Sequence, residues 1–130
     1  MENVLIKRID FIENVTIYES DNLNNFLESI NQNVNDCLII KNKNTIRLYS
    51  LNNSNCEDEN TVSALKIEGV GVRSNLAVIP LVLEYITKSY TLLDLFTNET
   101  SICFIINKCD NKNFTNQIKD IFIKEGFDVQ

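Results

Sequence analysis

The chain has 130 residues, 44% of them hydrophobic, and carries 12 basic against 18 acidic residues for a net charge of −6. This length and composition predict one ordinary globular domain spanning residues 1–130. The basic residues are scattered, which disfavours nucleic acid as a partner, because proteins that bind it concentrate cations on one surface.

The remaining composition argues against export, membranes and metals. The first eight residues lack the apolar core of a signal peptide, and no apolar run approaches the roughly 18 residues that span a bilayer. We therefore expect a soluble protein of the cytoplasm, or also of the nucleus, with no membrane partner. The four cysteines, Cys37, Cys56, Cys103 and Cys109, form no Cys-x-x-Cys pair and are expected to be reduced thiols. Since the chain has no histidine, no metal or cofactor is expected.

The first third of the chain predicts two strands and a helix. Residues 3–9 and 14–19 alternate loosely and contain β-branched side chains, with a turn expected near Glu13 and Asn14. Asp21 can cap a short helix that runs to about Gln32, because apolar residues recur there at spacings of three and four.

The middle of the chain predicts a hairpin and a further strand. Residues 37–41 and 45–51 flank a tight polar turn at 42–44, and a polar, acidic loop follows at 52–60. In the strand expected at 62–68, Leu65 and Ile67 share one face, and Gly69-Val70-Gly71 ends the strand.

The last third predicts two helices around one strand. Pro80 fits the first turn of a helix expected to continue to about Phe96, with an apolar arc wide enough for burial on more than one side. A strand at 101–107 and a helix at 113–125, ended by Gly126, complete the chain. The predicted fold class is α+β: a single domain whose mostly antiparallel sheet of about six strands has two to three helices packed on it.

The run Asn107-Lys108-Cys109-Asp110 after an apolar strand is typical of the loop that reads guanine in GTP-binding domains. Such domains also need a glycine-rich phosphate loop that contains Gly-Lys, and this chain has three glycines and no Gly-Lys pair. We therefore interpret the run as a turn that joins the last core strand to the closing helix.

No catalytic residues are predicted. Without histidine, the Ser-His and Cys-His arrangements are excluded, and the acidic cluster Glu57-Asp58-Glu59 reads as a solvated turn. We expect a protein that is not an enzyme and acts through its surfaces. Apolar residues around the 80–96 helix and the Phe104 strand exceed the need of one small core. Leu81, Leu83, Tyr85 and Phe104 are therefore the candidate partner interface.

The pattern over residues 36–130 resembles the small proteasome assembly chaperones, in particular the third member of that set. The resemblance lies in the hairpin 37–51, the polar loop into the strand 62–68, Pro80-Leu81 opening an apolar helix, the 101–108 strand and the helix 113–125. It implies a non-catalytic protein that pairs with a second small chaperone of similar fold. It also implies binding to proteasome α-subunits, which favours correct assembly of the α-ring.

Two alternatives belong to other classes. The stretch from Leu65-Lys66-Ile67-Glu68-Gly69 through Leu83-Glu84-Tyr85-Ile86 also resembles Alba-type nucleic-acid-binding domains, including subunits of RNase P, with 15–32 as their first βα unit. The acidic charge, the extra hairpin and the C-terminal helix argue against that alternative. The other is an unrelated interaction module.

Overall fold

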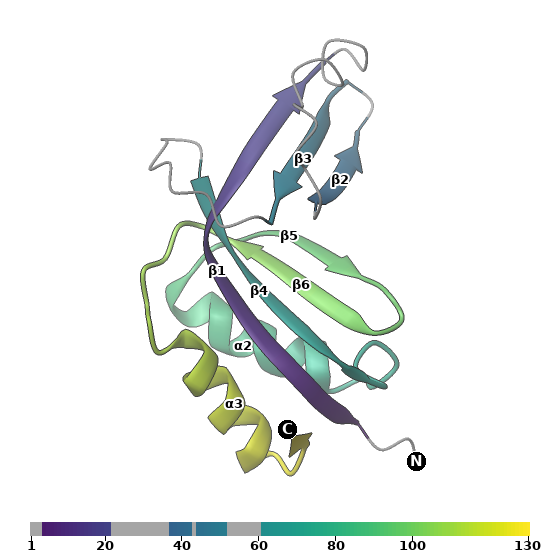
Figure 1. Cartoon of the computed structure of the whole chain (residues 1–130), viewed down its shortest axis with the longest axis vertical. Helices are drawn as coiled ribbons and strands as arrows, with labels where there is room; N and C mark the ends of the chain where they lie inside the picture. Colours follow the sequence, from purple (N-terminus) through teal and green to yellow (C-terminus); the bar gives the residue numbers. More distant parts are fainter. Residues whose placement is uncertain (1–3, 22–36, 43, 52–60) are drawn as a thin grey trace.

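The computed structural model describes residues 4–21, 37–42, 44–51 and 61–130 (Figure 1). The elements in chain order are β1 (Leu5–Ser20), β2 (Cys37–Lys41), β3 (Ile46–Ser50), β4 (Thr61–Val70), α2 (Val78–Ser89), β5 (Leu92–Thr97), β6 (Ser101–Ile106), α3 (Phe114–Lys124) and β7 (Asp128–Val129). The helix predicted to continue to Gln32 and the acidic loop 52–60 lie outside the described residues. The predicted α+β class is confirmed.

The strands form one curled sheet in the order β2-β3-β1-β4-β6-β5, in which all the pairs are antiparallel. The short strand β7 adds a parallel pair beside the start of β1. The predicted hairpin is confirmed as β2 and β3, and the Asn42 N–H donates to the Thr45 carbonyl at 2.8 Å across its turn. The helices α2 and α3 lie on the same side of the sheet (Figure 1).

The first two predicted strands are in fact one, because β1 runs unbroken for 16 residues. Its pairing with β4 shifts register between Ile6 and Arg8 and again between Ile12 and Val15. Each shift places one extra residue on β1, so the polar pair Glu13 and Asn14 makes an irregularity instead of a turn. Such bulges bend a strand without ending it. The bend carries the end of β1, together with β2 and β3, away from the rest of the sheet (Figure 1).

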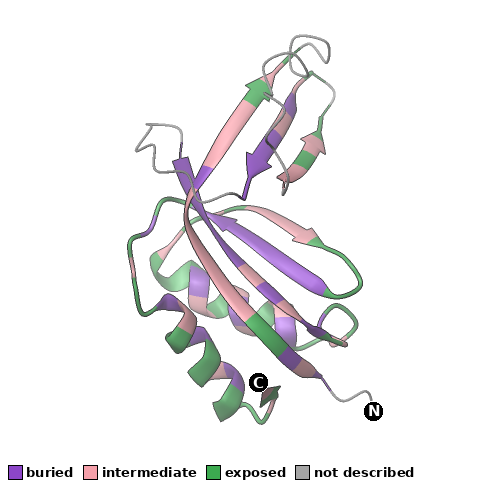
Figure 2. Ribbon diagram, viewed as in Figure 1, coloured by how far each residue is buried: buried purple, intermediate pink, exposed green. Residues whose placement is uncertain are grey.

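The curled sheet has a hydrophobic cluster on each face. The cluster under the helices combines Leu65 and Ile67 of β4 and Ile102, Phe104 and Ile106 of β6 with Val82, Ile86, Phe114, Ile118 and Phe122 of the helices. The cluster on the other face contains Val15, Tyr49, Val62, Ala64, Cys103 and Ile105. Because both of its faces are covered, β6 is buried along its whole length (Figure 2).

The helix predicted from Pro80 to Phe96 is shorter than expected, and α2 ends at Ser89. Residues 92–97 instead form the edge strand β5, which pairs with β6. Their apolar run fits a helix or a strand equally well, and hydrogen bonding to the neighbouring strand decides between the two. Pro80 lies in the first turn of α2, as predicted, where its missing N–H has no helical partner to lose.

The closing helix α3 ends as the sequence predicts, with Gly126 in the left-handed region at φ 88°. The Gly126 N–H donates to the Ile123 carbonyl and the Phe127 N–H to the Phe122 carbonyl, at 3.0 and 2.9 Å. Phe127 also packs edge-on against Phe122, with ring centroids 5.6 Å apart. These contacts together form a Schellman cap, which turns the chain back so that β7 reaches β1.

Candidate partner interface

The helix α2 carries more apolar surface than the core uses. Val78, Val82 and Ile86 are buried against the sheet. Leu81 and Tyr85 lie at the border of that core and remain half-buried. The outer sides of α2 and α3 face away from the sheet and include exposed positions (Figure 2).

A groove of about 270 Å³ lies between α2 and α3. Its apolar lining residues are Leu81, Tyr85 and Ile121. Its charged lining residues are Glu84 and Lys88 of α2 and Lys124 and Glu125 at the end of α3. An apolar floor inside a polar rim is the ordinary anatomy of a protein–protein contact.

Tyr85 is held in place by the residues around it. Its ring packs edge-on against Phe114, with centroids 5.7 Å apart, and its hydroxyl donates to the Gln117 side-chain oxygen. Burial raises the pKa of Tyr85, and the nearby Cys109 thiol raises it further. The hydroxyl is protonated at neutral pH, as any tyrosine near its ordinary pKa is, and it can donate this hydrogen bond. The groove thus has an ordered aromatic wall on the α2 side.

The structure separates the four predicted interface residues. Leu81 and Tyr85 line the groove, whereas Leu83 packs half-buried against the core away from it. Phe104 is a core residue with 0% of its surface exposed, so it offers no area to a partner. Ile121, which sequence reasoning missed, completes the groove. Its helical spacing from Ile118 placed it on the apolar face of α3. Only the packing of the helices shows that it lies at the border between the core and the groove.

The run Asn107-Lys108-Cys109-Asp110 forms the connection between β6 and α3. The Asn107 side-chain oxygen accepts the Thr91 N–H at 2.8 Å, which ties this connection to the start of β5. The Cys109 N–H donates to the buried Ser63 hydroxyl at 2.9 Å. The backbone and side-chain groups of this run are therefore used to join β4, β5 and β6.

The Cys109 thiol lies in a small polar network beside the groove. It is 6% exposed and accepts the Asn111 N–H at 3.4 Å. A hydrogen bond with this thiol, together with burial, raises the pKa of Tyr90. The Asn111 side-chain amide donates in turn to Gln117 at 3.0 Å, so the network supports the residue that holds Tyr85.

A second polar cluster, the β3–β5 cluster, consists of Arg47, Tyr49 and Asp94. The Tyr49 hydroxyl donates to the Asp94 carboxylate, and an Arg47 guanidinium nitrogen lies 3.3 Å from the same oxygen. Burial raises the pKa of Tyr49 to about 12, with a further contribution from the hydrogen bond to Asp94. Sequence reasoning missed this cluster because it placed Asp94 on a helix. The cluster joins β3 and β5, which are separated by three other strands in the sheet.

Neither a protein-family model nor a curated protein matches this chain. Within the described part of the chain, no three Cys, Asp or Glu side chains are placed to hold a metal ion. Among the same residues, no helix is long and apolar enough to cross a membrane.

Proposed function

We propose that this chain is a non-catalytic assembly chaperone that pairs with a second small chaperone and binds proteasome α-subunits. The observation that supports it best is the α2–α3 groove, where Leu81, Tyr85 and Ile121 form an apolar floor inside a charged rim. The sequence resemblance to the small proteasome assembly chaperones supplies the identity of the partners.

Such a groove favours binding to another protein for a physical reason. Each Å² of apolar surface removed from water contributes about 25 cal/mol, and the ordered Tyr85 loses little side-chain freedom on binding. The rim alternates sign along both helices, with Glu84 and Lys88 on α2 and Lys124 and Glu125 on α3. Complementary charges on a partner would then set the orientation. A chaperone needs only such a surface, because masking part of an incomplete ring disfavours wrong neighbours.

Affinity purification of the tagged chain from its native cells tests the proposal. We expect proteasome α-subunits and a second small chaperone to co-purify. Recovery of RNase P proteins instead, with binding of structured RNA in a gel shift at moderate salt, would replace this proposal with the nucleic-acid alternative.

A variant of the groove rim locates the interface. Lys88→Glu with Lys124→Glu reverses two exposed rim charges, and we expect it to reduce recovery of the second chaperone. Lys108→Glu with Lys112→Glu is the matched control, because both lysines are exposed and lie outside the groove lining. Equal recovery with both double variants would remove the groove from the proposal.

A further inference from the structure

Within the described part of the chain, one side of β1 has no neighbouring strand over residues 7–12. On one side it pairs with β4 from Leu5 to Thr16. On its other side it pairs with β7 at Leu5 and Ile6 and with β3 from Thr16 to Ser20. No described strand pairs with this second side between positions 7 and 15. In Figure 1 this is the outer edge of the lower sheet, on the side of α3.

Part of this edge is regular enough to accept another strand. From Arg8 to Ile12 the pairing with β4 runs without a shift, between the two bulges. Every second residue of such a stretch points its N–H and C=O away from β4. A row of unpaired backbone groups of this kind is a template for an added strand.

A pocket of about 280 Å³ lies at the start of this edge. It is lined by Lys7, Arg8 and Ile9 of β1, by Thr115 and Lys119 of α3, and by Gln130 after β7. The Gln130 N–H donates to the Ile6 carbonyl at 2.9 Å, and Val129 and Gln130 both line the pocket, so the pairing of β7 with β1 reaches the pocket. An extended segment in the pocket would continue the line of β7 along β1.

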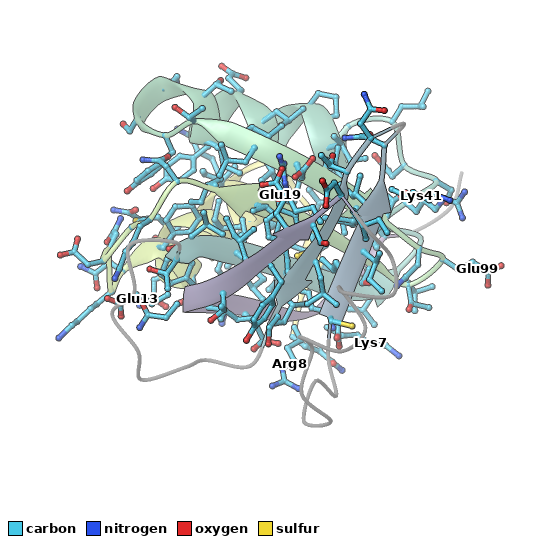
Figure 3. The ribbon with its side chains drawn as sticks, turned by 90° about the horizontal axis from the view of Figure 1, so that it is seen from above. Lys7, Arg8, Glu13, Glu19, Lys41 and Glu99 are labelled. Atoms are coloured by element: carbon cyan, nitrogen blue, oxygen red, sulfur yellow. The ribbon has the colours of Figure 1, made fainter. Side chains whose placement is uncertain are left out.

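The pocket is basic although the chain is acidic. Its lining contains three cationic side chains and no carboxylate side chain. Arg8 is paired with Asp10 at 2.7 Å, whereas Lys7 and Lys119 form no ion pair with any residue that the structure describes. Figure 3 shows Lys7 and Arg8 reaching outward from the molecule, with Lys41 in a different region. Two accessible ammonium groups on β1 and α3 thus flank the open edge.

We propose that the edge from Arg8 to Ile12 binds an extended segment of a protein partner, which adds a strand to β1 and places a carboxylate between Lys7 and Lys119. Backbone hydrogen bonds supply the affinity, and the two ammonium groups select an acidic residue at the pocket. This site is separate from the α2–α3 groove and does not depend on the function proposed above.

The charges favour an acidic protein segment over a nucleic acid. Binding of a nucleic-acid backbone needs many phosphate contacts along one surface, and this pocket supplies three cations on a chain of net charge −6. On the adjoining face of β1 and β4, Arg8 and Lys66 are already paired with Asp10 and Glu68, so that face adds no free cation for a continuous run of phosphates. A single carboxylate on an extended segment meets the lysines without reaching that face.

The test uses the full chain and a ten-residue probe peptide rich in Thr and Val with two adjacent glutamates at its centre. A control peptide carries lysines in place of the glutamates. Binding is measured by NMR titration, and amide hydrogen exchange of residues 8–12 is followed with and without the probe. Lys7→Gln with Lys119→Gln removes the two free cations, and Lys41→Gln with Lys108→Gln is the matched control at exposed sites outside the pocket.

We expect saturable binding of the acidic peptide, none of the basic one, and slower exchange of the outward amides between Arg8 and Ile12. The Lys7 and Lys119 double variant should bind about fivefold more weakly, since each exposed charge pair contributes roughly 0.5 kcal/mol. The control variant should bind like the natural chain. The proposal is overturned if those amides are already protected in the free chain, if the two double variants bind alike, or if structured RNA displaces the peptide at the same residues.

Discussion

Replacing Tyr49 with phenylalanine tests whether the β3–β5 cluster stabilises the curl of the sheet. The ring is buried and packs edge-on against Phe96, so the substitution keeps the packing and removes the hydroxyl alone. That hydroxyl donates to the Asp94 carboxylate, and a hydrogen bond to a charged group contributes about 1.5–3 kcal/mol. We expect Tyr49→Phe to lower the free energy of unfolding by that amount at pH 8.

The same hydroxyl predicts how this difference changes with pH. Its pKa is raised from 10.0 to about 12 in the folded chain, so the folded state holds this proton more tightly than the unfolded state. The stabilisation is complete below pH 10 and is lost as the pH rises toward 12. At pH 11 the loss due to the Tyr49 hydroxyl is about 1.4 kcal/mol, and Tyr49→Phe lacks this contribution.

Urea unfolding of both proteins at pH 8 and pH 11 measures the two differences. Comparing the proteins at each pH cancels the other groups that titrate there. A cycle with Asp94→Asn and the double variant isolates the coupling between the two side chains, which we expect to be about 1 kcal/mol or more. The same difference in unfolding free energy between the two proteins at both pH values would show that the cluster does not act as described. The absence of coupling between Tyr49 and Asp94 would show the same.

Two further substitutions test the packing. A Cβ on Gly69 would lie 2.1 Å from the Leu5 carbonyl oxygen. Gly69→Ala should therefore lower the free energy of unfolding in urea by at least about 2 kcal/mol. The neighbouring control Val70→Ala, at a half-exposed position, should lower it by less than about 0.5 kcal/mol. Phe104→Ala should cost about 3–5 kcal/mol because it empties the core, and Leu76→Ala, at a position 92% exposed, should leave the melting temperature unchanged. Comparable losses for Phe104→Ala and Leu76→Ala would contradict the core position of Phe104.

Sequence patterns located most elements whose signals are local. The hairpin of β2 and β3, the strand β6 and the helix α3 with its Gly126 cap were all predicted within one or two residues. Each depends on residues close in the chain, such as a tight polar turn or a glycine that adopts a positive φ. The positions of Leu65 and Ile67 on the core face followed in the same way from the alternation of β4.

The errors fell where distant contacts compete with local preference. The run 92–97 can be a helix by its apolar pattern, yet its pairing with β6 makes it the strand β5. Glu13 and Asn14 favour a turn, yet β1 pairs with β4 both before and after them, so they form a bulge within one strand. Of the four predicted interface residues, Leu81 and Tyr85 line the groove and Leu83 and Phe104 do not, for a related reason. Phe104 and Leu83 are apolar like Leu81, and only the packing of the helices shows which apolar side chains remain accessible.

The sequence by itself thus determined the α+β class, the caps and turns, and the acidic net charge of a chain that has no histidine. These depend on neighbouring residues or on composition. Only the tertiary structure decided that the sheet curls, that Tyr49 meets Asp94, and that α2 and α3 leave a groove between them. Among the residues that the structure describes, it also left part of one β1 edge without a neighbouring strand beside Lys7 and Lys119. These features join residues far apart in the chain, and their geometry follows from packing that no local pattern encodes.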